Sequence, residues 1–154
     1  MPHGGSMTDF TDIAARCDAI EECYEFMLAY AAQGVVDDRE SRAGSQLREM
    51  LSRAVEAAAG LPQAYATAVT ALRLEPEQPY TDFLDVLGAD TAKALAAMRL
   101  VLVQLRISSQ LIDNLNASLH VRTLLTDVFL LDAVLGRQEA DSPPFVGAAS
   151  PPPR

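Results

Sequence analysis

The sequence predicts an all-α fold, an up-and-down bundle of four to five helices with a long C-terminal helix and a disordered proline-rich tail. About half of the 154 residues are apolar (49%), but only 6% are aromatic and none is Trp. The core must therefore be built from Leu, Ala, Val, Ile and Met, and Ala and Leu are strong helix formers. Apolar residues also recur at helical spacing along most of the chain.

One domain is expected over residues 8–136, because a chain of this length fits a single hydrophobic core. Residues 1–7 are predicted to be a disordered N-terminus or the remnant of an expression vector. Residues 137–154 contain five prolines and few large apolar residues. They are predicted to be a disordered tail, since burial of so little apolar surface cannot offset the entropy lost on ordering.

The first helix is predicted over residues 8–33, with Thr8 or Thr11 as its N-cap and Gly34 just after its end. Its apolar residues recur at alternating spacings of three and four residues, which favours near-parallel packing against other helices. This apolar stripe consists of Phe10, Ile13, Cys17, Ile20, Tyr24, Met27 and Ala31.

Three shorter helices are predicted next, and each is delimited by Gly or Pro. Gly60 ends the first, Pro62 lies in the first turn of the second, and Gly88 ends the third. Pro76 and Pro79 mark a loop between the second and the third. The predicted ranges are 42–59, 62–74 and 80–87.

Residues 90–135 form the longest helical pattern, with Asp90 in place to cap it. A straight helix of this length would measure about 70 Å, too long for a compact domain of this size, so it either breaks or projects into a partner. Ser108–Ser109 and Asn114–Asn116 are the expected weak points, because their side chains compete for backbone hydrogen bonds. No Gly or Pro forces a break. We predict one long bent helix, and two helices remain the alternative.

Residues 94–105 are apolar almost all round the predicted helix. Such a helix is typical of a central position or of a surface covered by a second copy, which predicts a homodimer. The wider run over residues 94–107 contains two Arg and is too short to cross a bilayer.

The formal net charge of −9 disfavours binding to nucleic acid and to acidic membranes, since both are strongly anionic. No apolar secretory signal occurs at the N-terminus. Cys17 and Cys23 lie six residues apart on one helix and cannot pair with each other, so a reducing cytoplasm is expected. Abundant Ala, and eleven Arg against one Lys, indicate a GC-rich bacterial genome.

Familiar chemical motifs are missing from the sequence: it has no glycine-rich phosphate loop, Cys-x-x-Cys, Glu-x-x-His or Gly-x-Ser-x-Gly. We therefore expect no metal, no cofactor and no catalytic residue. Neither thiol is predicted to be a nucleophile. Cys17 occupies the core stripe, and Cys23 is flanked by Glu21, Glu22 and Glu25, whose charges raise the pKa of a thiol.

Short polar side chains share one pole of the predicted last helix. A solvated face, a hydrogen-bonded interface and a ligand site are all open interpretations of this polar stripe. In the ligand site, Arg106 would bind an anion, while Asp113, Asn116 and His120 would orient the ligand or exchange protons. Asp113 and His120 lie about 10.5 Å apart along the axis, so they cannot share one metal ion. The stripe contains Arg106, Ser109, Asp113, Asn116, His120, Thr123 and Asp127.

Two functions are consistent with these features. The first is a non-catalytic interaction protein, an accessory, assembly or regulatory partner that packs helix-in-groove against another protein or a second copy of itself. The alternative is a small-molecule-binding protein or a small enzyme that uses the polar stripe. Tail segments Ser-Pro-Pro-Phe-Val-Gly and Pro-Pro-Pro-Arg are either linker or extended segments docked by a partner. The predicted interface anchors are Phe10, Tyr24, Met98 and Leu102.

Overall fold

The structure, a computed structural model, describes residues 5–141, with side chains for residues 10–136. Within this range the chain forms six α-helices, one 3-10 turn and no strand, so the predicted all-α fold is confirmed. The elements are α1 (Gly5–Ala31), η1 (Asp38–Glu40), α2 (Arg42–Ala59), α3 (Leu61–Leu72), α4 (Glu77–Leu102), α5 (Ser109–Ala117) and α6 (His120–Asp141).

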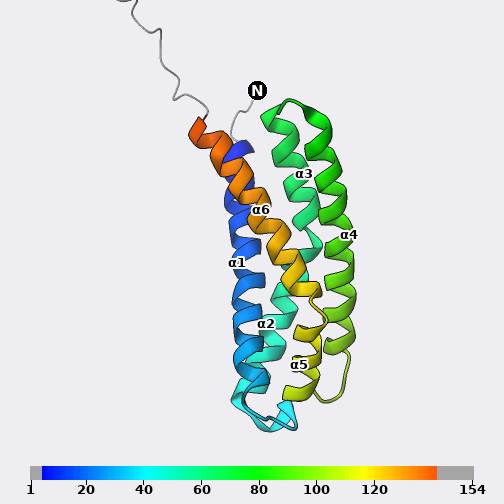
Figure 1. The fold of residues 1–154 in the computed structure, drawn as a ribbon. Helices are drawn as coiled ribbons and strands as arrows, with labels where there is room; N and C mark the ends of the chain where they lie inside the picture. The colour runs from blue at the N-terminus through cyan, green and yellow to red at the C-terminus, as the bar shows by residue number, and fades with distance from the viewer. Residues whose placement is uncertain (1–4, 142–154) are drawn as a thin grey trace, which may run out of the picture.

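The helices form an up-and-down bundle of four columns (Figure 1). α1 runs down the bundle, α2 and α3 return end to end, α4 runs down again, and α5 and α6 return end to end. α1 packs against α2, α3, α5 and α6, and α4 packs against the same four helices. The columns formed by α1 and by α4 are single helices, and each contacts both of the columns that consist of two helices. This is the packing that the predicted bundle requires.

The break between α2 and α3 lies at Gly60, where the sequence predicts it. Arg16 Nη1 donates to the carbonyls of Glu56 (3.3 Å) and Ala57 (3.2 Å) at the end of α2. A cation at this position complements the partial negative charge of the helix terminus. A Cβ at Gly60 would lie 2.5 Å from Arg16 Nη1, so glycine leaves room for the guanidinium.

The helix predicted over residues 80–87 is too short. It does not end at Gly88, because α4 begins at Glu77 and continues through Gly88 to Leu102. A glycine in a helix interior lowers stability by only about 1 kcal/mol relative to Ala, which packing of α4 against both broken columns outweighs. α3 ends at Leu72, two residues before the predicted end, and Arg73 follows in the left-handed region (φ 49°).

The prediction of one long bent helix over residues 90–135 is wrong. The segment reverses direction in a turn over residues 103–108, and a second break separates α5 from α6. Ser108 caps α5 by accepting a hydrogen bond from the N–H of Leu111 (3.1 Å), so the weak point expected at Ser108–Ser109 is confirmed. The second break follows Asn114–Asn116, at Ser118 and Leu119, where Leu119 has a positive φ of 65°.

The ends of the bundle extend beyond the predicted limits. α1 begins at Gly5 rather than near residue 8, and α6 continues to Asp141, past the predicted domain end at residue 136. The predictions for residues 1–4, and for the tail from residue 142 onward, lie outside the described residues. No helix in the described part of the chain is long and apolar enough to cross a membrane.

The apolar stripe predicted on the first helix faces the core. α1 buries more than this stripe, because Cys23 (1% exposed) and Tyr30 (0%) also lie inside the bundle. Of the stripe residues, the buried ones are Ile13, Cys17, Ile20 and Met27, and those half-buried against the core are Phe10, Tyr24 and Ala31.

The α4–α5 turn, residues 103–108, is held by a buried ion pair. Asp38 of η1 is 2% exposed, and it accepts hydrogen bonds from Arg48 Nε (2.5 Å) and from the N–H of Ile107 (2.6 Å). Burial alone raises the pKa of Asp38, but these hydrogen bonds outweigh burial and hold that pKa below its ordinary value. Arg48 also donates to the carbonyls of Leu102 (3.1 Å), Gln104 (2.8 Å) and Leu105 (3.2 Å). The turn is therefore fixed to α2 and η1.

Candidate functional site

The structure does not bring the four predicted ligand residues together. Arg106 is exposed in the α4–α5 turn, where its Nε lies 3.5 Å from Asp37 Oδ2. Asp113 is exposed on α5, Asn116 is half-buried near the end of α5, and His120 is half-buried at the start of α6. The two breaks after residue 102 rotate these segments relative to one another, so the predicted common pole does not exist.

The polar stripe as a whole is also wrong. Ser109 and Asp127 are buried, whereas Phe129, two residues after Asp127 on α6, is 51% exposed. Ser109 Oγ donates to the carbonyl of Tyr30 (2.6 Å) and accepts from the N–H of Val35 (2.8 Å). Its role in this structure is to join α5 to the end of α1.

An apolar groove lies between the second half of α4 and the α5–α6 column. We call it the His120 groove, because His120 is the one predicted ligand residue that lines it. Its volume is about 520 Å³. Leu100, at 65% exposed, is its most exposed large apolar side chain. The lining residues are Lys93, Ala96, Ala97, Leu100, Val101, Leu111, Asn114, Leu115, Ser118 and His120.

The predicted interface anchors are not the apolar side chains that face outward. Met98 is completely buried in the core, so it cannot anchor a partner, and that prediction is wrong. Phe10, Tyr24 and Leu102 are half-buried against the core. A run that is apolar all round gives no sign of which side faces solvent, so the sequence could not separate Met98 from Leu100. The exposed large apolar residues are Leu28, Val36, Val86, Leu100, Val103, Leu105, Leu119, Phe129 and Leu130.

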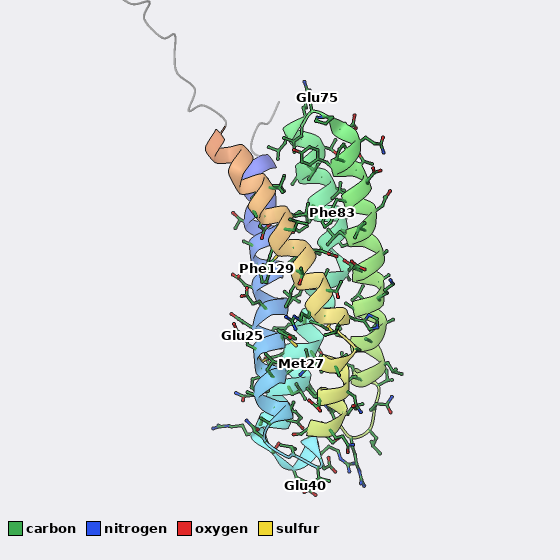
Figure 2. All side chains as sticks on the ribbon, viewed as in Figure 1. Glu25, Met27, Glu40, Glu75, Phe83 and Phe129 are labelled. Carbon is green, nitrogen blue, oxygen red and sulfur yellow. The ribbon has the colours of Figure 1, made fainter. Side chains whose placement is uncertain are left out.

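A second apolar groove lies between the first turns of α4 and the middle of α6. We call it the Phe83 groove, after the side chain labelled between these helices in Figure 2. Its volume is about 340 Å³, and Leu130 on its rim is 52% exposed. The lining residues are Pro76, Pro79, Tyr80, Phe83, Leu130, Leu131 and Val134.

A carboxyl pair, buried Asp127 and half-buried Asp90, joins α4 to α6. Asp127 is 8% exposed, and its Oδ2 has no hydrogen-bond partner. Burial raises the pKa of Asp127 to about 7, and a hydrogen bond and repulsion from Asp90 act in the same direction. Asp127 therefore keeps its proton to a higher pH than an exposed aspartate does. The sequence does not predict this pair, because its pattern assigns Asp90 to a helix N-cap and Asp127 to the polar stripe.

Both thiols are buried and unpaired with each other. Cys17 Sγ lies 3.7 Å from Tyr65 Oη, which donates to Asp132 Oδ1 (2.6 Å). Burial raises the pKa of Cys17 to about 11 and that of Cys23 to about 12, so both thiols stay protonated. For Cys23 the cause of the raised pKa is burial rather than the neighbouring carboxylates.

Among the described side chains, no group of three or more His, Cys, Asp and Glu is placed to hold a metal ion. No protein-family model matches the chain, and searches of curated proteins and of solved structures find no match either.

Proposed function

We propose that this chain is a non-catalytic interaction protein that binds an amphipathic helix of another protein in the His120 groove. The observation that carries the proposal is an open apolar groove of about 520 Å³ beside Leu100, a leucine that is 65% exposed. Exposed apolar surface of this kind is typical of binding sites. Helix-in-groove recognition inserts apolar side chains spaced three or four residues apart into such grooves.

The charges at the groove indicate what else the bound helix carries. Two of the lining side chains can be cationic: Lys93, the single lysine of the chain, and His120. We therefore expect a carboxylate beside the apolar stripe of the helix, in reach of the Lys93 ammonium. The net charge of −9 disfavours a partner that is strongly acidic as a whole, because long-range repulsion slows association.

A second copy of the chain fits this surface less well. Part of the apolar run that predicts a homodimer is already covered within one chain, since Met98 and Val101 are buried. Two copies with a net charge of −9 each also repel one another. Self-association stays a prediction, and sedimentation equilibrium of the isolated chain tests it. A cytoplasmic location, which two free thiols support, is part of the same proposal.

The test places a photoreactive amino acid at position 100 in one variant and at position 28 in another. Leu28 is the matched control, because it is an exposed leucine (49%) on α1 that lines neither groove. Cross-linking in a lysate of the source organism, followed by mass spectrometry, identifies the captured segment. We expect position 100 to capture an amphipathic helix that position 28 does not capture.

Binding of that segment, synthesised as a peptide, then separates a specific site from chance capture. Leu100→Asp should weaken binding by about tenfold or more, the effect of losing about 1.4 kcal/mol of contact. Leu28→Asp should change the affinity by less than about twofold. Equal affinities for the two variants, or a captured segment with no helical pattern, would contradict the proposal.

The alternative, a small-molecule-binding protein, is favoured by one observation. His120 lines the groove together with Lys93, so an amphiphile with an anionic head would find both an apolar surface and a cation. Arg106, Asp113 and Asn116 do not line this groove, so His120 is the one predicted ligand residue that could contact a molecule bound there. Mass spectrometry of the purified chain under native conditions tests it: a bound small molecule that His120→Ala releases would favour this alternative.

A further inference from the structure

The most exposed large apolar side chains of the described chain gather at one end of the bundle. Val36 (80% exposed), Val103 (77%) and Leu105 (72%) exceed all the others, of which the next, Leu100, is 65% exposed. Val36 lies in the connection between α1 and η1, and Val103 and Leu105 lie in the α4–α5 turn. These two loops meet at the lower end of the bundle in Figure 1. We call the three side chains the apolar tip.

Direct hydrogen bonds hold the two loops together. The carbonyl of Val35 accepts from the N–H of Ser109 (2.8 Å), and the N–H of Val35 donates to Ser109 Oγ (2.8 Å). The buried pair of Asp38 and Arg48 also fixes the α4–α5 turn. The apolar tip is therefore part of an ordered surface. Aliphatic side chains that an ordered surface gathers in one exposed patch are typical of a contact site.

The apolar tip lies among Arg side chains. The two loops with one turn of each adjoining helix, residues 28–45 and 99–112, contain four Arg and three acidic residues. The guanidinium of Arg48 reaches the same end, where it donates to three carbonyls of the α4–α5 turn and its start. Five Arg against three acidic residues give this end a local charge of +2, in a chain whose net charge is −9.

The carboxylates at this end lie inward, and most of the guanidinium groups lie outward. The side chains of Asp37 and Asp38 are only 11% and 2% exposed, whereas those of Arg39 and Arg106 are 47% and 65% exposed. Glu40, labelled at this end in Figure 2, is the one exposed acidic residue of these segments. The surface around the apolar tip is therefore mainly cationic.

We propose that this end of the bundle docks on the surface of an anionic phospholipid membrane. The apolar tip enters the boundary between the lipid headgroups and the acyl chains, as the apolar side of an interfacial helix does. Arg42 and Arg106, at the same end, bind lipid phosphates, because one guanidinium can donate two hydrogen bonds to a phosphate. No residue of the tip lines either groove, so the tip projects rather than encloses. Projecting side chains suit a fluid lipid surface, whereas a folded partner would need a matching hollow.

The net charge of −9 does not prevent this contact, because the charge is distributed unevenly along the bundle. α4 alone spans 26 residues, about 39 Å, and exposed charges in physiological salt act over only about 8 Å. The acidic residues next nearest to this end, Glu25, Glu49 and Asp113, lie more than one helical turn from the loops. The expectation from composition, that acidic membranes are disfavoured, applies to the molecule as a whole and not to this end.

The absence of Trp from the sequence allows a direct test. Leu105→Trp in the full chain introduces a single indole at the apolar tip. Leu130→Trp is the matched control, because Leu130 is 52% exposed but lies on α6 in the Phe83 groove. Vesicles of equal parts phosphatidylglycerol and phosphatidylcholine should shift the Leu105→Trp emission to shorter wavelength and lower its acrylamide quenching constant several-fold. The emission of Leu130→Trp should not change.

Co-sedimentation with the same vesicles tests the tip without an added ring. Leu105→Asp should lower the membrane affinity of the chain about tenfold or more, and Leu130→Asp should lower it by less than about twofold. Arg42→Gln should weaken binding several-fold, because a cation next to the membrane is lost. Arg53→Gln is the matched control for charge, since Arg53 is exposed on α2 about 16 Å farther along the helix axis.

Failure of the natural chain to bind the phosphatidylglycerol vesicles would overturn the proposal and leave the tip to a partner protein. Equal binding to vesicles of phosphatidylcholine alone would overturn it as well. Equal responses at positions 105 and 130 would place the contact elsewhere on the molecule and count against the tip. An emission shift of Leu105→Trp that needs no vesicles and grows with protein concentration would assign the tip to a second copy instead. None of these results bears on the His120 groove, so this proposal and the proposed function can fail separately.

Discussion

Replacement of Asp127 by Asn tests the buried carboxyl pair through the pH dependence of stability. Asp127 is 8% exposed beside Asp90, and its folded-state pKa is raised from 3.8 to about 7. Between these values the folded chain binds a proton that the unfolded chain has released. Stability therefore decreases as pH rises from about 4 to about 7, and the full loss persists above that range.

The expected size of this loss follows from the displacement of the pKa. Each pKa unit corresponds to about 1.4 kcal/mol, so ionised Asp127 lowers the free energy of unfolding by at most about 4 kcal/mol above pH 7. The side-chain amide introduced by Asp127→Asn carries no charge and can donate to Asp90 as the protonated carboxyl does. Asp127→Asn should therefore stabilise the chain by about 2–4 kcal/mol near pH 8 and have little effect near pH 4.5.

Urea unfolding followed by far-UV circular dichroism at several pH values measures this difference. Asp113→Asn controls for the loss of one negative charge, because Asp113 is exposed on α5. The raised pKa of Asp127 would be refuted if Asp127→Asn were no more stable than the natural chain near pH 8. It would also be refuted if the stability of the variant fell with rising pH as steeply as that of the natural chain.

Other substitutions test the packing that supports the grooves. Arg48→Ala leaves the buried Asp38 carboxylate without its cation and should destabilise the chain by about 3 kcal/mol in urea unfolding. Adding Asp38→Asn to this variant should recover part of the lost stability. A destabilisation by Arg48→Ala of less than about 1 kcal/mol would contradict the role given to this ion pair. Gly44→Ala should destabilise by about 2 kcal/mol or more, because its Cβ would lie 2.1 Å from the Asp38 carbonyl oxygen. A Cβ added at Gly88 has no neighbouring atom within 4 Å, so Gly88→Ala should stabilise α4 by about 0.5–1 kcal/mol and raise the melting temperature. A lower melting temperature would contradict this prediction.

Periodicity was sufficient to predict the first column of the bundle. The spacing of Ile13, Cys17, Ile20 and Met27 identifies the buried side of α1, and Gly60 marks a real break. These features depend on neighbouring residues only, so a single sequence reveals them.

The turn after α4 could not be predicted in this way. No Gly or Pro occurs near it, and it is stabilised by contacts of Arg48 and Asp38, which lie more than 50 residues earlier in the chain. The predicted polar stripe assumes one unbroken helix, so the side-chain directions before and after this turn have no common reference. Arg106 and Asp127 therefore do not share a face: Arg106 is exposed in the turn and Asp127 is buried on α6.

The breaks at Gly60 and at Ser118–Leu119 fall near the same height of the bundle (Figure 1). Within the described residues, α2 has no close backbone contact with α6 and α3 has none with α5. The two ends of the bundle are thus joined by α1 and α4, which run through both, and by the end-to-end contacts of α2 with α3 and of α5 with α6. Since the Phe83 groove lies against the first turns of α4 and the His120 groove against its last turns, we expect occupancy of one groove to leave the other groove free to bind.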